Sequence, residues 1–280
     1  MTITTNIYNY FPKFLDDATN DKNNSYESVI TDNVICFREE NNDIGITVAK
    51  EFLKLESFAL RQVASAAKID ISIITRLGQK SRNDLIVENL NTLFPSRYKN
   101  RNILVRNNGY SSLSDENKKS IRAFNGSQYK RVWDSDFFHD VYDLLIERHQ
   151  MSLDCSNHYN NGGLYRTNES SYGLFLFNKS ANIKPGIIVW NSEIGARSFG
   201  YYTFYLIDNK YHLMWESSNH NRKRYIHRGN VISGMRDYIN AVEDLTKNLD
   251  ERLSNDLEVF EKAKVTYITS YDKLLMLLKS

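Results

Sequence analysis

The sequence predicts an α+β protein with a central antiparallel β-sheet, an N-terminal helical region and a long C-terminal helix. Three features lead to this prediction: an aromatic and β-branched run from Lys184 to Trp215, helical periodicity between residues 55 and 94, and an apolar repeat that starts at Val231. Residues of these types favour strands and helices respectively. We expect three parts: residues 1–54, a flexible N-terminal segment with short strands; 55–230, the α+β core; and 231–280, a long C-terminal helical segment.

The run from Lys184 to Trp215 predicts three antiparallel strands. It is broken at Asn191–Gly195 and again at Asp208–Lys210, where Asp and Asn tolerate the positive φ of a tight hairpin. The segment Gly173–Phe177 supplies a fourth strand. Between Ser198 and Ile207 the alternation leaves both faces of the strand apolar or aromatic.

The first part of the chain carries weaker signals. The Asn- and Asp-rich stretch from Asp16 to Ser25 predicts a flexible loop, and apolar residues within 28–37 and 42–48 predict a small hairpin. Further along, strands are expected at 101–106 and 120–124, and an amphipathic helix at 136–147.

Residues 60–77 resemble a helix-turn-helix. Ala64 is small enough for two helices to cross, Ser72 is a candidate cap for the second helix, and Lys68 occupies the position where glycine is usual. Two interpretations remain open: a reader of duplex sequence, or a structural hairpin whose outer face is merely basic. The side chains expected on that face are Thr75, Arg76, Gln79, Lys80 and Arg82.

One short motif links the chain to a known family. Residues 185–195 read PGIIVWNSEIG, which resembles the signature of the phage/plasmid-like protein family, a domain of unknown function. Ile121–Phe124 with Tyr129, and Tyr225–Gly229, are similar to two further segments of that family, so the resemblance covers roughly residues 55–245. Where the family carries a Cys-Thr-Asn-Gly turn, this chain has Ile207–Lys210 and lacks the cysteine. The resemblance implies a phage or plasmid context and no established activity.

Basic residues are unevenly distributed although the formal net charge is only +2. Nine basic residues against two acidic ones lie between Pro95 and Arg131, and five against none between Ser217 and Arg236. Clusters of this kind attract polyanions, and exposed aromatic rings can stack on bases. The predicted nucleic-acid contacts are Arg101, Arg106, Lys130, Arg131, Tyr201, Arg222, Lys223, Arg224 and Arg228.

No catalytic, metal or cofactor site is predicted. None of the six histidines forms a close ligand pair, and Gly162–Gly163 is not followed by the residues of a phosphate loop. Within the signature turn, formed by Asn191, Ser192, Glu193 and Gly195, Glu193 is the best candidate for a functional acid. The alternative is structural: Asn191 and Ser192 bond the backbone and Glu193 pairs with an arginine such as Arg197.

The C-terminal repeat predicts self-association. Apolar residues recur every three or four positions from Met235 to Phe260, as in a coiled-coil seam or a helix that lies across a sheet. Either a second protomer covers the distal stripe, which makes the chain a homo-oligomer, or residues 267–278 fold back on it.

Together these features favour a phage or plasmid accessory protein that binds single-stranded DNA in recombination or replication. The order of strands and a long helix is similar in outline to single-strand annealing proteins, a fold-level analogy. The alternative is a protein-interaction factor that inhibits a host defence or transcription component; an enzyme is the third choice. Two isolated cysteines and no apolar run of about 20 residues predict a cytoplasmic protein without a membrane partner.

Overall fold

The computed structural model describes most of the chain and divides it into two compact units, Met1–Tyr238 and Ile239–Ser280. Of residues 183, 207, 210–213 and 222 it describes the backbone alone. The described residues are 5–30, 35–48, 50–94, 101–107, 119–153, 163–177, 183–207, 210–213, 222–247, 251, 254–256, 258 and 262.

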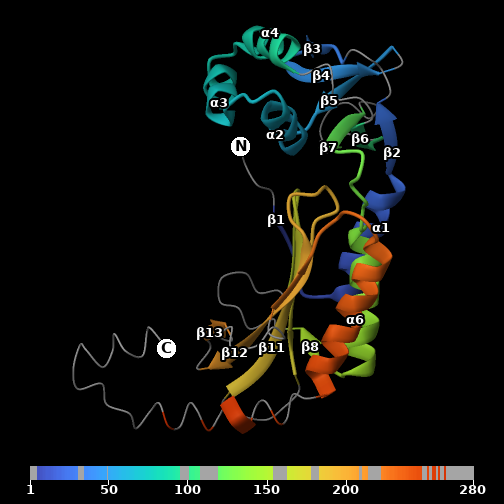
Figure 1. The fold of residues 1–280 in the computed structure, drawn as a ribbon, viewed down its shortest axis with the longest axis vertical. Coiled ribbons are helices and arrows are strands. Elements are labelled where there is room, and N and C mark those ends of the chain that lie inside the picture. The colour runs from blue at the N-terminus through green and yellow to red at the C-terminus, as the bar shows by residue number, and fades with distance from the viewer. Residues whose placement is uncertain are drawn as a thin grey trace, which may run out of the picture. The chain divides into compact units, whose positions relative to one another are not determined.

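The first unit contains the predicted antiparallel sheet, in which the aromatic run of the sequence forms the neighbouring strands β11, β12 and β13 (Figure 1). The order is β1-β9-β10-β11-β12-β13, with β8 beside β10 and β14 beside β12. Both faces of β12 are covered, because Phe199, Tyr201 and Phe204 are all fully buried. The strands are β1 (Thr5–Tyr8), β8 (Ser152–Leu153), β9 (Leu164–Thr167), β10 (Ser171–Leu176), β11 (Ile183–Asn191), β12 (Phe199–Ile207), β13 (Lys210–Leu213) and β14 (Arg222–Tyr225).

A second sheet, also in the first unit, has the order β2-β6-β7-β5-β4-β3. Its pairs are antiparallel except β5 with β7. Of the hairpin predicted from residues 28–37 and 42–48, the second strand is found as β4, which pairs with β3, whereas residues 28–30 belong to β2 and pair with β6. One apolar core lies between this sheet and the three helices within residues 57–93. The strands are β2 (Ser25–Ile30), β3 (Phe37–Glu40), β4 (Asp43–Val48), β5 (Glu51–Leu55), β6 (Arg101–Arg106) and β7 (Ser120–Asn125).

The predicted flexible loop at Asp16–Ser25 is wrong, because helix α1 (Phe11–Asn23) occupies most of it. Phe11, Phe14 and Ala18 recur at helical spacing and are buried. Phe14 contacts Phe138 of helix α5 (Asp134–Val141), with ring centroids 4.6 Å apart, and α5 continues into the π-helix η1 (Tyr142–Arg148). Most polar residues of α1 are exposed, among them Asp16, Thr19 and Asn20, so spacing and not composition identifies this helix.

The helix-turn-helix segment does form a helical hairpin, with α2 (Ser57–Ala66) and α3 (Ile71–Gln79), followed by α4 (Asn83–Leu93). Ala64 and Ile74 are buried, as the pattern predicts. The cap is Asp70 and not Ser72, because the Asp70 carboxylate accepts the backbone N–H of Ser72 at 2.7 Å. Lys68 lies at φ 58, the left-handed conformation that glycine adopts with least strain.

The predicted long C-terminal helix is described only as α6 (Val231–Lys247). Tyr238, the last residue of the first unit, is fully buried, with its ring 5.9 Å from that of Tyr201. The apolar positions 249, 253, 257 and 260 lie outside the described residues, so self-association stays a prediction. Among the helices described, none is long and apolar enough to cross a membrane.

We expect Lys68→Gly to raise the free energy of unfolding by roughly 0.5–1 kcal/mol, because a side chain at positive φ is strained. Urea unfolding measures the change. Lys80→Gly is the matched control, since Lys80 lies at φ −96 and gains nothing from glycine. A loss of stability in Lys68→Gly as large as that in the control would contradict the assigned turn.

Candidate functional site

The signature turn after β11 is held by a buried ion cluster. Glu193 is 3% exposed, and its Oε1 accepts from Arg122 Nη2 at 2.6 Å and from Arg166 Nη2 at 3.4 Å. Arg122 belongs to β7 of the six-stranded sheet and Arg166 to β9 of the eight-stranded sheet. One carboxylate therefore joins segments that are far apart in the sequence.

A second carboxylate, Asp134 at the start of α5, completes the cluster. It accepts from Ser171 Oγ at 2.5 Å and from Asn191 Nδ2 at 2.8 Å, and its own backbone N–H donates to Glu193 Oε2 at 3.3 Å. Burial and the neighbouring Glu193 charge raise the pKa of Asp134. Burial acts the same way on Glu193, but the charges of Arg122 and Arg166 outweigh it and hold its pKa below the usual value.

These contacts fit the structural interpretation of the signature turn. Asn191 donates to the backbone carbonyl of Val132 at 2.9 Å, and Ser192 Oγ donates to that of Glu169 at 2.6 Å. Arg197, the example given for the arginine partner of Glu193, is not that partner, since Glu193 pairs with Arg122 and Arg166 instead. Glu193 is enclosed and charged, so the geometry gives it no route to a substrate.

Beyond Glu193, the turn docks against the six-stranded sheet. Ile194 is 1% exposed and packs on Leu104 of β6 and Ala123 of β7. Gly195 adopts φ 83, and a Cβ there would lie 2.8 Å from the Tyr129 ring. The Tyr129 hydroxyl donates to the backbone carbonyl of Glu193 at 3.1 Å. The signature residues thus fix where the next residues, Ala196 to Ser198, lie.

Those residues line a cleft of about 840 Å³, which we call the arginine cleft. Its walls come from α2, from the ends of β6 and β7, from the loop 126–129, from the signature turn and from the segment 224–228. Among the described residues, no acidic side chain lines it. The arginines that line it are Arg61, Arg101, Arg197, Arg224 and Arg228.

The floor of the cleft carries an ordered amide pair. Gln62 Oε1 accepts the backbone N–H of Phe124 at 2.6 Å, which orients the Gln62 amide so that its Nε2 donates to Asn125 Oδ1 at 2.8 Å. Asn125 Nδ2 is then a donor, and it has no partner among the described residues although Asn125 is only 5% exposed. An unsatisfied buried donor is costly, and a ligand oxygen would satisfy it.

His227 adds a neutral ring beside the arginines. It stacks on Tyr129, with ring centroids 5.2 Å apart, and its Nδ1 lies 3.3 Å from the carbonyl oxygen of Lys130. Burial lowers the pKa of His227 to about 4. The imidazole is therefore uncharged at neutral pH, and the positive charge of the cleft comes from its arginines.

Of the predicted nucleic-acid contacts, Arg101, Arg224 and Arg228 meet in the arginine cleft. Lys130 is exposed and Lys223 partly exposed, and neither lines the cleft; the side chain of Arg222 lies outside the described residues.

Three of the predicted contacts are wrong because their side chains are buried. Tyr201 is fully buried among aromatic residues, so it offers no face for stacking. The Arg106 side chain, 6% exposed, pairs with Asp21 and Glu56. The Arg131 side chain, 1% exposed, pairs with Glu27 at 2.9 Å and donates to the backbone carbonyl of Glu193.

Sequence reasoning missed two arginines of the cleft. Arg61 was part of the helix-turn-helix pattern, yet it lines the cleft and pairs with Glu169. Arg197 was named as an example of an arginine that could pair with Glu193 if the signature turn is structural. Its guanidinium instead lies over the ring of Tyr172, with the carbon 5.7 Å from the ring centroid. No local pattern marks either residue as part of a cleft.

Comparison with known proteins adds no family. No family model, curated protein or solved structure matches the chain. The resemblance to the phage/plasmid-like protein family accordingly stays a prediction, and the function rests on the geometry of the cleft.

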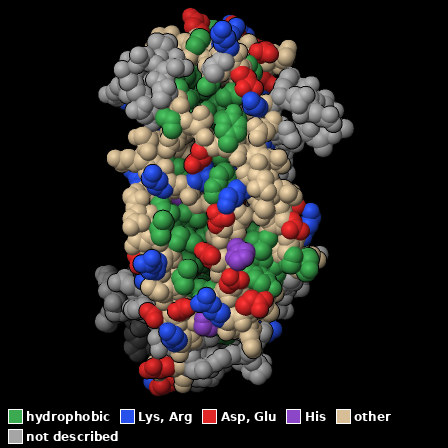
Figure 2. All heavy atoms as spheres, turned by 90° about the vertical axis from the view of Figure 1, so that its right-hand side faces the viewer, with side chains coloured by type: hydrophobic (Ala, Val, Ile, Leu, Met, Phe, Trp, Pro, Cys, Tyr) green, Lys and Arg blue, Asp and Glu red, His purple; other side chains and the backbone are tan. Residues whose placement is uncertain are grey.

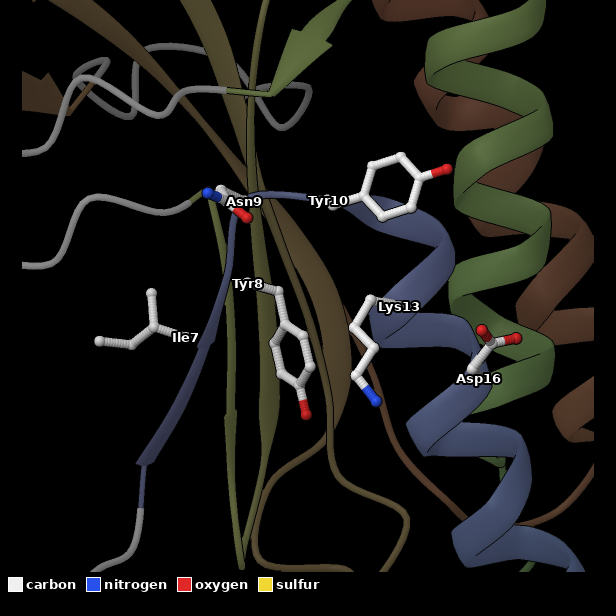
Figure 3. A pocket seen from close by; sticks show the side chains of 6 residues that line it. All are labelled: Ile7, Tyr8, Asn9, Tyr10, Lys13 and Asp16. Carbon is white, nitrogen blue, oxygen red and sulfur yellow. The ribbon is translucent and has the colours of Figure 1, made fainter.

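A smaller cavity of about 400 Å³ lies where β1 leads into α1 (Figure 3). Lys13 and Asp16 give it one basic and one acidic lining residue, and Lys13 pairs with Asp17 at 2.7 Å. On the face seen in Figure 2, basic and acidic side chains are likewise interspersed. Within the described ranges, no three potential metal ligands come together. The arginine cleft differs from these surfaces because its described lining includes basic residues and no acidic one.

We expect Glu193→Gln to lower the free energy of unfolding by about 3–5 kcal/mol, because it leaves Arg122 and Arg166 buried without their counter-charge. Urea unfolding at pH 7 measures this loss. Glu51→Gln is the control, since Glu51 pairs with Lys119 at a site where its side chain is 47% exposed, and it costs less than about 1 kcal/mol. Equal losses in the two variants would show that the buried cluster is not a principal source of stability.

We expect His227 to make the fold sensitive to acid. Because its pKa is lowered to about 4 from the ordinary value of about 6.5, the unfolded chain binds the proton first as pH falls between these values, and stability drops by on the order of 2–3 kcal/mol. Urea unfolding between pH 7 and pH 4 measures the slope. In His227→Gln that part of the slope disappears; an unchanged slope would refute the assignment. His139→Gln, at an exposed site, controls for the loss of a histidine.

Proposed function

We propose that this chain binds single-stranded nucleic acid in the arginine cleft, as an accessory factor without catalysis in the recombination or replication of a phage or plasmid. The observation that carries the proposal is the cleft itself, whose described lining contains five arginines and no acidic residue. Arginine donates to phosphate oxygens in a planar fork and keeps its charge at every physiological pH.

The other lining residues support a single strand over a duplex. Phe58, Tyr129 and Ile226 supply apolar surface next to the arginines, and Ile226 is 62% exposed. Unpaired bases gain free energy by covering such surface, whereas the bases of a duplex are already stacked. A cleft of about 840 Å³ accommodates a ligand of a few nucleotides, whereas a double helix is too large to enter it.

The helix-turn-helix interpretation places binding elsewhere. Thr75, Arg76, Gln79, Lys80 and Arg82 are all exposed, and none of them lines the cleft. Arg82 is partly neutralised, since its Nη2 lies 2.8 Å from Asp84. A reader of duplex sequence would prefer one duplex over others by about a thousandfold or more, which separates it from the cleft proposal.

The protein-interaction alternative would place the partner on the aromatic sheet or on the acidic C-terminal helix. The burial of Tyr201 and Phe204 in strand β12 of that sheet does not favour the first of these surfaces. A protein partner would need another surface, for which exposed Ile232 of α6, 76% accessible, is a candidate. DNA binding that is absent at low salt would favour this alternative.

We expect the affinity for an unstructured DNA oligonucleotide to fall steeply with salt, and Arg224→Ser with Arg228→Ser to weaken it. Each lost phosphate contact lowers the magnitude of the slope of log K against log salt by about 0.7 for a single strand, so the double variant should lose roughly 1.4. Fluorescence anisotropy across a salt series measures both quantities.

The matched control is Arg76→Ser with Lys80→Ser, which removes the same charge from exposed positions of α3. Its affinity for single strands should remain close to that of the original protein. If the control weakens binding as much as the cleft variant does, net charge and not the cleft governs binding. Thermal unfolding of both double variants checks that the fold is retained.

A further inference from the structure

Three of the cleft arginines carry charge that no described residue neutralises. Arg197, Arg224 and Arg228 are exposed and form no ion pair with any described residue, whereas Arg61 pairs with Glu169. Three uncompensated guanidinium groups around one cleft repel each other unless a ligand supplies negative charge. The ligand must therefore bring its charge into a small volume.

The backbone of these arginines is anchored before any ligand arrives. The backbone of Arg224 in β14 is paired with that of Gly200 in β12, and the backbone of Arg228 forms a β-bridge with that of Tyr129. The turn that carries Arg197 is closed by Ala196, whose N–H donates to Ser192 Oγ at 3.0 Å. Anchored arginines lose less conformational entropy on binding than arginines on a free loop, which favours a defined anion site.

The ligand that suits this site carries more negative charge on one phosphate than an internal phosphate of a strand does. Each internal phosphodiester carries a single negative charge, whereas a terminal phosphate carries about −1.5 to −2 at neutral pH. A volume of about 840 Å³ holds only a few nucleotides, so an end brings more charge into it than an internal segment does. We propose, on the basis of the function inferred above, that the arginine cleft binds the phosphorylated end of a nucleic-acid strand.

The floor of the cleft suits the same ligand. Asn125 Nδ2 is held as a donor by Gln62 and has no described partner, so it can donate to an oxygen of the terminal nucleotide. The chemistry recognised is a phosphomonoester next to a nucleoside. Two sources offer that chemistry, the end of a strand and a free nucleotide, and competition distinguishes them.

The test compares one oligonucleotide sequence in four forms: with a 5′-phosphate, with a 3′-phosphate, with hydroxyls at both ends, and ligated into a circle. Each carries an internal fluorophore, and anisotropy at one salt concentration gives its Kd. We expect one of the two phosphorylated forms to bind about tenfold more tightly than the hydroxyl form, and the circle to bind no better than the hydroxyl form.

Two variants connect that preference to the cleft. Arg197→Ser and Asn125→Ala should each reduce it to less than about threefold while binding of the circle changes less, and Arg76→Ser should leave it intact. Because Asn125 is buried, thermal unfolding is measured for Asn125→Ala to check that the fold is retained. Arg197 is exposed, so Arg197→Ser tests the preference without a risk to folding.

The outcomes separate this inference from the proposed function. Equal affinity for all four forms, still dependent on Arg224 and Arg228, overturns the end preference and leaves single-strand binding in place. Failure of every form to bind overturns both proposals. A nucleoside monophosphate that competes at micromolar concentration identifies the free nucleotide as a source and supports the phosphomonoester site; competition only by phosphorylated strands supports the strand end.

Discussion

The first unit depends on one buried contact, the carboxylate of Glu193 between Arg122 and Arg166. Removing these charges from water costs several kcal/mol for each ion, and short, directional hydrogen bonds must offset that cost. Since Arg122 and Arg166 belong to different sheets, only an arrangement that brings both strands to the signature turn satisfies the carboxylate. The same arrangement buries Ile194 against β6 and β7 and leaves the following residues at the wall of the cleft.

How much of the fold the sequence predicts depends on how local the signal is. The strands from β10 to β13 follow from residue type and from turns between neighbours, and they are found as expected. Helix α1 is missed because its Asn and Asp residues suggest a loop, although three apolar residues at helical spacing decide the outcome. The pairing of β2 with β6 joins residues 25–30 to 101–106, and no short-range pattern in either segment identifies the other.

The candidate site was only partly predictable for the same reason. Counting charges finds segments rich in arginine, but it cannot tell which guanidinium group will be buried. Arg106 and Arg101 lie on one strand, yet the first pairs with Asp21 and Glu56 inside the protein and the second reaches the cleft. Their fates differ because the partners come from distant elements, α1 and the residue before α2. An arginine partner for Glu193 was foreseen, with Arg197 as the example, but the partners are Arg122 and Arg166, which are far from Glu193 in the sequence.

The distribution of charge between interior and cleft accounts for the anion site. A formal net charge of +2 suggests a nearly neutral surface, but the neutralisation is local. The buried arginines Arg106, Arg122 and Arg166 have the carboxylates of Asp21, Glu56, Asp134 and Glu193 around them. Carboxylates committed to that cluster are unavailable to Arg197, Arg224 and Arg228 of the cleft, which are exposed. The buried arginines are therefore paired with carboxylates that would otherwise offset the charge of the cleft. The positive potential of the cleft follows from the same ion-pair network that stabilises the fold.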